Sequence, residues 1–255
     1  GMPILGKDNV CLLKKSLYGL KQAGARWYST LSTELRRQGF QPSDAEPCLW
    51  MYNHGGVKIW MIYHVDDALF MSTNMDKCNQ ILASINTRLE HTVNEGLADW
   101  YVGMRIEQEI QHGRLVSATL SQEPYIKQIC KSNGIALDSK ARTHVPATPD
   151  KLSKLDCPKV ATEQVRAMQA KFQSNVGALL FLARCTMPQI AYAVGRLGRF
   201  AGNSGPPHWK EMQHLIRYIK TVRTMGITYR RPSVGDPAFI KAFTPTAILA
   251  EWNAK

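Results

Sequence analysis

Two neighbouring aspartates, Asp66 and Asp67, separate two apolar segments of the chain. A buried carboxylate is costly unless it is paired or bound to a metal. Side chains alternate between the faces of a strand, so both aspartates share a direction only if the chain turns there. A turn between two strands would place the carboxylates at a hairpin tip, where they could hold Mg²⁺ for phosphoryl transfer. The alternative is a plain capping role, because aspartate is common in exposed turns.

The segments around this pair have the patterns of strands and helices. We expect strands over 48–52 and 57–73, joined by a turn at Asn53-His54-Gly55-Gly56. The spacing of Trp27, Leu31 and Leu35 predicts a helix that Gly39 closes. Later elements are a helix capped by Asn74, a hairpin over 100–110 and 114–120, and a helix over 121–133.

Beyond residue 137 the composition changes. Three prolines among polar residues predict a linker over 137–162. Helical spacing follows, with a capping box at Thr186-Met187-Pro188-Gln189 and a helix that contains Trp209 and Ile219. Short strands are predicted over 227–229 and 239–243. The order of elements favours an α+β domain followed by a helical one.

Composition excludes several classes of protein. Hydrophobic residues make up 44% of the 255 residues and charged residues 20%, which is typical of a folded globular chain. No stretch approaches the roughly 20 apolar residues of a membrane helix. Six cysteines without a CxxC pair indicate reduced thiols in an intracellular protein and argue against zinc.

The net charge of +12 is unevenly placed. Residues 1–40 carry seven Lys or Arg and two Asp or Glu, and residues 163–231 carry eleven and two. The stretch between them carries twelve basic and fourteen acidic residues. Two basic zones around a slightly acidic middle suit a protein that binds a polyanion near a cation site. Chance asymmetry of a solvated surface is the alternative.

A series of short sequence blocks runs along the chain in a fixed order. The blocks are Leu13-Lys14-Lys15-Ser16-Leu17-Tyr18-Gly19-Leu20-Lys21-Gln22-Ala23, Trp27-Tyr28, Gly39-Phe40, Pro47-Cys48-Leu49, Val65-Asp66-Asp67, Tyr101-Val102-Gly103-Met104, Leu120-Ser121-Gln122, Tyr125-Ile126, Val176-Gly177, Leu182-Ala183-Arg184, Ile190-Ala191-Tyr192-Ala193-Val194, Arg199-Phe200, His208-Trp209 and Arg217-Tyr218. In this order they resemble the reverse transcriptases of Ty1/copia-type retrotransposons. So many blocks in one order are far more specific than any single block.

The resemblance implies a domain plan. Residues 1–136 would be a palm of antiparallel sheet and helices with only part of the fingers, a primer-side hairpin and the first thumb helix. Residues 137–162 would be a linker and 163–231 a helical thumb and connection region. Residues 232–255 would be a truncated start of the ribonuclease H region. An exposed palm surface would then favour self-association.

The resemblance also implies roles for single residues. Asp66 and Asp67 would bind Mg²⁺ or Mn²⁺ for nucleotidyl transfer on an RNA or DNA primer-template with dNTPs. Gly19 and Lys21 would approach the template and the incoming nucleotide. A further basic stripe on one helix would face a duplex, made of Lys210, Arg217 and Lys220. The protein would be found in the cytoplasm, a virus-like particle or the nucleus, with no membrane partner.

Departures from the family pattern bear on activity. Relatives use a further aspartate on a strand upstream of the Leu17-Tyr18-Gly19-Leu20-Lys21 block, and we expect this chain to begin after it and to be inactive alone. His64 stands where many relatives have tyrosine. The alternative function is a non-catalytic nucleic-acid-binding remnant of a mobile element. An unrelated metal-dependent hydrolase is the third reading, although no two histidines have the helical i, i+4 spacing.

Overall fold

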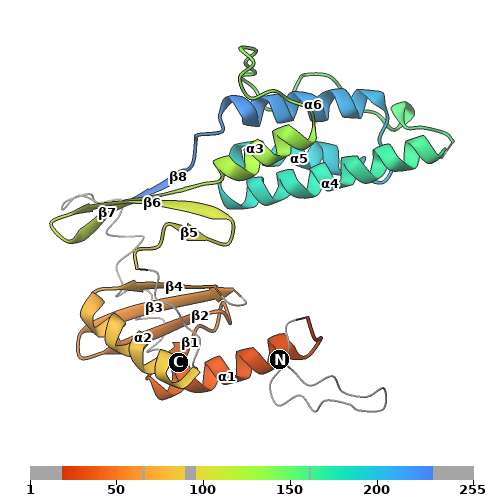
Figure 1. Cartoon of the computed structure of the whole chain (residues 1–255). Helices are drawn as coiled ribbons and strands as arrows, with labels where there is room; N and C mark the ends of the chain where they lie inside the picture. Colours follow the sequence, from red (N-terminus) through yellow and green to blue (C-terminus); the bar gives the residue numbers. More distant parts are fainter. Residues whose placement is uncertain (1–18, 65–66, 90–95, 161, 232–255) are drawn as a thin grey trace, which may run out of the picture. The chain divides into compact units, whose positions relative to one another are not determined.

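The computed structural model describes residues 19–64, 67–89, 96–160 and 162–231, which form two compact units divided between Val102 and Gly103. The sequence had predicted the first boundary later, at residue 136. Both units combine helices with antiparallel strands, so the α+β class is confirmed (Figure 1). The strand predicted over 239–243 lies outside the described residues. No described helix is long and apolar enough to cross a membrane.

The first unit is built around a four-stranded antiparallel sheet. Its strands stand in the order β1-β2-β3-β4. The elements in chain order are α1 (Ala23–Arg37), β1 (Gln41–Pro42), β2 (Leu49–His54), β3 (Val57–His64), β4 (Asp67–Ser72), α2 (Met75–Leu89) and β5 (Trp100–Tyr101). The predicted first hairpin is confirmed, because His54 pairs with Val57 across Gly55 and Gly56, whose φ angles are both positive. Asn74 caps α2 by accepting a bond from the Lys77 amide.

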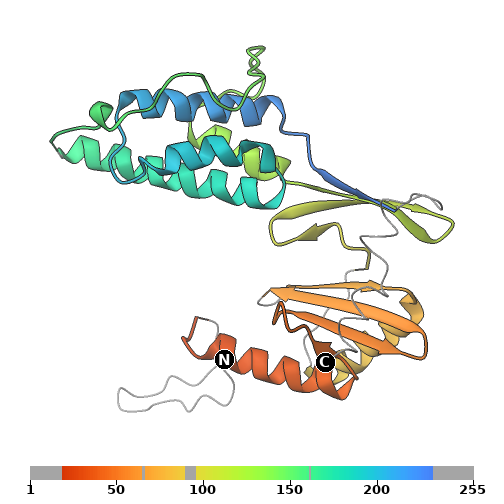
Figure 2. The ribbon, with the colours of Figure 1, turned by 180° about the vertical axis from the view of Figure 1, so that it is seen from behind.

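Helices α1 and α2 cover one face of this sheet. Alternate residues of β3, namely Ile59, Met61 and Tyr63, are buried in a core that also contains Leu35 of α1 and Ile81 of α2. Figures 1 and 2 show α2 on the same side of the sheet from opposite views. On the other face the apolar side chains are half-buried or exposed, and they include Met51, Trp60, Ile62, Leu69 and Met71.

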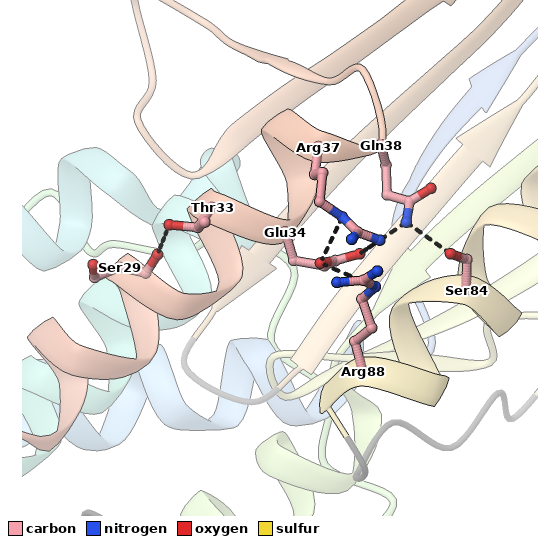
Figure 3. Close-up of polar contacts among 7 residues, drawn as sticks. All are labelled: Ser29, Thr33, Glu34, Arg37, Gln38, Ser84 and Arg88. Atoms are coloured by element: carbon pink, nitrogen blue, oxygen red, sulfur yellow. Dashed lines mark hydrogen bonds and ion pairs between the residues drawn. The ribbon is translucent and has the colours of Figure 1, made fainter.

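A buried carboxylate joins the two helices beneath the sheet. Glu34 of α1 is only 6% exposed, and its Oε1 accepts a 2.8 Å bond from the Gln38 amide (Figure 3). The Gln38 amide nitrogen also donates to Ser84 Oγ of α2 at 2.8 Å. Arg37 and Arg88 approach Glu34 Oε2 at 3.4 and 4.0 Å. The carboxylate therefore fixes α1 to α2, and both helices to the strands they support.

The second unit contains a twisted antiparallel ribbon and a helical core. The ribbon consists of β6 (Met104–Gln111), β7 (Arg114–Ser121) and β8 (Ile227–Arg230), with β7 in the middle. Both the hairpin predicted around His112-Gly113 and the short strand predicted near 227 are confirmed. The helices are α3 (Glu123–Ser132), η1 (Lys154–Asp156), α4 (Glu163–Cys185), η2 (Pro188–Ile190), α5 (Ala191–Gly198) and α6 (Pro206–Thr221).

The helical core explains why the first unit ends early. Ile126 and Ile129 of α3 pack with Phe172 of α4, Leu197 of α5 and Leu215 of α6 in one apolar cluster. Helix α3 therefore belongs with the later helices. The capping box predicted at Thr186 is wrong, because the Thr186 hydroxyl donates to the buried Gln122 side chain at 2.8 Å and leaves the next helix without a side-chain cap.

The segment 137–162, which the sequence predicted to be a linker, forms hydrogen bonds with side chains of α6. Glu211 accepts bonds from the Thr148 amide and hydroxyl at 2.9 and 2.6 Å. His214 bonds the Val145 carbonyl oxygen at 2.9 Å, and the Thr143 amide donates to Thr221 Oγ1 at 3.1 Å. Figure 1 shows the segment running over α6. Proline and polar composition correctly predicted irregular backbone there, but it gave no sign of these side-chain partners.

Replacing Glu34 with alanine tests the polar junction under the sheet. Glu34→Ala leaves Gln38 and two arginines without their acceptor, so we expect the free energy of unfolding to fall by about 1–3 kcal/mol. The measurement is amide hydrogen exchange of α1 and α2. Thr33→Ala is the matched control, since this exposed hydroxyl only bonds Ser29 O within α1 (Figure 3). Equal exchange in the two variants would show that the junction contributes nothing.

Candidate active site on the β3–β4 hairpin

The β3–β4 hairpin positions the acidic pair predicted from the sequence. β3 ends at His64 and β4 begins at Asp67, and these two residues are cross-strand partners. Only residues 65 and 66 separate them in the chain, so the chain reverses direction between the two apolar segments, as predicted. Asp66 lies outside the described residues. Asp67 is exposed at the first position of its strand.

Asp67 is free to accept a cation. No Lys or Arg among the described residues forms an ion pair with it. An unpaired, exposed carboxylate with a second aspartate beside it in sequence fits a hard divalent ion, which prefers oxygen ligands. Within the part of the chain that the structure describes, no three His, Cys, Asp or Glu side chains gather into a metal-binding group.

Tyrosines and a cysteine surround this end of the sheet. Burial raises the pKa of Tyr101, and the negative charge of Asp67 and then Cys48 raise it further. Burial is also the main cause that raises the pKa of Tyr63, followed by Cys48 and Tyr28. The Tyr28 and Tyr63 rings lie 6.2 Å apart. The Tyr63 and Tyr101 phenols therefore stay protonated and neutral, and Tyr101, whose pKa the charge of Asp67 raises, adds no competing charge there.

The loop residues predicted to contact nucleotide are exposed. Gly19 has a φ of +90° with open space around its α-carbon, and Lys21 lies at the surface just before α1. A positive φ favours glycine and lets the backbone come close to a ligand. Lys21 has no ion pair with another described residue, so its ammonium remains available to a phosphate.

The basic stripe on α6 is only partly as predicted. Lys210 and Arg217 are exposed and lie two turns apart on one face. Lys220 requires a correction: it is only 4% exposed, and its ammonium donates to the Ser139 and Ala141 carbonyl oxygens at 2.9 and 3.0 Å. The ammonium is therefore used inside the second unit, where it holds the segment that precedes Thr143.

A groove on α5 brings together residues to which the sequence analysis had assigned no role in a site. Its volume is about 720 Å³, and Tyr192, Arg199 and Lys151 line it with apolar neighbours. Tyr192 is 75% exposed, and the Arg196 guanidinium lies 5.9 Å from its ring centre. The i, i+4, i+7 spacing of Tyr192, Arg196 and Arg199 was visible in the sequence. The spacing alone did not predict the groove, because Lys151 also lines it and belongs to the segment 137–162, far from α5 in the sequence.

Comparison of the sequence with known proteins shows the family of the chain. The model of the family described as reverse transcriptase (RNA-dependent DNA polymerase) matches residues 2–147, more than half of the chain. The chain belongs to this family. The Pol polyproteins of transposon TNT 1-94 from Nicotiana tabacum and of transposon RE2 from Arabidopsis thaliana are 30% and 28% identical over 227 residues. These matches cover 86% and 88% of this chain.

These relatives show that the chain is a fragment of a reverse transcriptase of the copia type. It spans 16% and 14% of the length of the two plant polyproteins. A putative transposon Ty5-1 protein from Saccharomyces cerevisiae is 28% identical, over 89% of this chain and 70% of its own length. No solved structure gives a significant match. The matched family range includes the β3–β4 hairpin of this reverse transcriptase, whereas α4, α5 and α6 lie beyond it.

Substitution of Lys220 separates a structural lysine from a surface one. Lys220→Ala leaves two carbonyl oxygens of the bound segment without their donor, so we expect a loss of about 1–3 kcal/mol in the free energy of unfolding. Lys210→Ala on the same helix should change it by less than about 0.5 kcal/mol. Urea denaturation followed by far-ultraviolet circular dichroism measures both. A harmless Lys220→Ala would refute the assigned role.

Proposed function

We propose that the β3–β4 hairpin is the metal-binding centre of an RNA-directed DNA polymerase. The observation that carries the proposal is the register that pairs His64 with Asp67, which leaves that carboxylate exposed and without an ion-pair partner among the described residues. Asp66 and Asp67 would hold Mg²⁺ or Mn²⁺. The first unit then corresponds to the palm, with α1 and α2 as its supporting layer.

The chemistry of this centre is nucleotidyl transfer. The 3′-hydroxyl oxygen of a primer would lose its proton to solvent and bond to the α-phosphorus of a dNTP, while the bond to the β-phosphate breaks and pyrophosphate leaves. The bound ions supply charge stabilisation for the attacking and leaving oxygens. The protein's own part would be to hold Asp67 at the first position of β4, near the neutral Tyr101 phenol, which does not compete for the cation. Because the geometry is set before substrate arrives, little reorganisation accompanies the reaction.

The nucleic acid would be held by the basic surfaces and the ribbon. The β6–β7 hairpin would steady the primer end, and the helices from α3 onward would form the thumb and connection region. Exposed Lys210 and Arg217 would contact phosphates. Tyr192 and Arg199 would contact a base and its phosphate in the α5 groove. Gly19 and Lys21 would approach the incoming nucleotide. Because the relatives are retrotransposon polyproteins, we propose an intracellular location for this work.

The second candidate function is nucleic-acid binding without catalysis. It is favoured by the finding that, among residues 19–64, 67–89, 96–160 and 162–231, no three His, Cys, Asp or Glu side chains form a group that could hold a metal ion. Removing one ligand of a metal pair commonly lowers rates by orders of magnitude. Under this candidate the basic helices keep their role, and the hairpin binds a cation without assembling a complete centre.

A primer-template assay distinguishes the two candidates. We expect the 255-residue polypeptide to bind primer-template in a salt-dependent way and not to extend it, because the described groups supply too few ligands. Mn²⁺ binding, measured by electron paramagnetic resonance, should be lost in Asp66→Asn and Asp67→Asn. The matched control Asp44→Asn, an exposed aspartate elsewhere in the first unit, should retain it.

Two outcomes would contradict these expectations. Template-directed extension that exceeds the Asp66→Asn background would show that the polypeptide already has a complete centre. Mn²⁺ binding that survives both hairpin substitutions would place the cation elsewhere and refute the assignment of Asp66 and Asp67.

The basic and aromatic residues of the second unit provide a separate test. Lys210→Gln and Arg217→Gln should each lower the slope of log affinity against log salt by about 1. Tyr192→Ala should weaken binding of a single-stranded oligonucleotide by about 1–3 kcal/mol through lost base stacking. Arg166→Gln, exposed at the start of α4, is the control for the arginine and lysine variants. Unchanged binding in Tyr192→Ala, measured by fluorescence anisotropy, would remove the groove from the proposed interface.

A further inference from the structure

His64 and Asp67 face each other across the β3–β4 hairpin. They are direct cross-strand partners, so their side chains project from the same face of the sheet. Directly opposed residues of an antiparallel pair have β-carbons about 4.5–5.5 Å apart. That separation is short enough for an imidazole nitrogen and a carboxylate oxygen to reach one ion.

Both side chains are available for such a contact. Each residue is exposed, and neither side chain forms an ion pair or hydrogen bond with another described residue. The next pair along the same face is Ile62 and Leu69, which are half-buried apolar residues. The two polar groups therefore stand at the edge of an apolar surface with no described protein group to satisfy them.

The combination of ligands points to a different class of ion from Mg²⁺. Magnesium prefers oxygen ligands in an octahedral arrangement, whereas neutral imidazole suits first-row transition metals. Histidine is also the commonest metal-ligating side chain in proteins. An imidazole directly opposite a carboxylate thus adds a nitrogen ligand that two adjacent aspartates cannot supply.

We propose that His64 and Asp67 together bind a divalent first-row transition ion through one imidazole nitrogen and one carboxylate. This inference rests on the proposed function, because Asp67 is shared with the metal centre of the hairpin. It adds a specificity: the hairpin accepts Mn²⁺ or Zn²⁺ with a nitrogen ligand and prefers these ions to Mg²⁺. The competing explanation is that His64 and Asp67 form an ordinary surface pair that no metal joins.

Pulsed electron paramagnetic resonance of bound Mn²⁺ tests the nitrogen ligand directly. The 255-residue chain is loaded with Mn²⁺ alone, and the echo modulation from a coordinated imidazole ¹⁴N is recorded. We expect the modulation in the unsubstituted chain and its loss in His64→Gln. His54→Gln is the matched control, because His54 is an exposed histidine of the same sheet, paired with Val57 across the β2–β3 hairpin. It should keep the modulation.

Competition between ions provides the second readout. In His64→Gln the affinity for Mn²⁺ and Zn²⁺ should fall relative to the affinity for Mg²⁺, whereas His54→Gln should leave the ratio unchanged. Circular dichroism confirms that each variant is folded, which we expect because both side chains are exposed.

The outcomes separate this inference from the proposed function. Bound Mn²⁺ without nitrogen modulation, lost in Asp67→Asn, would overturn the role of His64 and leave the acidic centre intact. Modulation that persists in His64→Gln would assign the nitrogen to another histidine and also overturn it. A chain that binds no Mn²⁺ would refute both proposals.

Discussion

The pairing register of β3 with β4 is the constraint on which the candidate site depends. Ile59, Met61 and Tyr63 alternate into the core under the sheet, and a slip of one residue would turn them outward. Their burial therefore fixes which residues reach the end of the hairpin. Because His64 and Asp67 stand on the face away from the helices, the same burial that stabilises the core leaves the polar pair in solvent. The position of Asp67 is therefore a consequence of how the core packs and not of contacts that Asp67 itself makes.

Three charged side chains elsewhere in the chain are buried and connect parts of the structure. Glu34 joins α1 to α2, Glu211 holds Thr148, and Lys220 holds Ser139 and Ala141, and all three charged side chains are buried. A buried charge is tolerated only with partners, so each of these groups fixes one backbone arrangement. Asp67 differs from them, because it is exposed and forms no ion pair with another residue that the structure describes.

The sequence predicted most of the elements because their signals are local. Glycines at positive φ, the Asn74 cap and the alternation in β3 each act within a few residues, and these predictions were confirmed. Long-range partners were not predictable. The stripe containing Lys210, Arg217 and Lys220 has the spacing of one helix, yet Lys220 turns to carbonyl groups some 80 residues earlier in the chain. The Thr186 cap failed for the same reason, since its hydroxyl bonds Gln122.

The candidate site shows a second limit of prediction from the sequence. The sequence alone identified Asp66 and Asp67 as neighbours. Whether the His64 side chain lies on the same face of the sheet as Asp67 depends on which residue of β4 pairs with His64. The hairpin register makes His64 and Asp67 neighbours on one face, although they are three positions apart in the chain. Had the reversal needed one residue more or fewer, His64 would oppose a different residue and the imidazole would leave the carboxylate. In the proposed site, the choice of ion would therefore depend on the length of the turn as much as on the aspartates themselves.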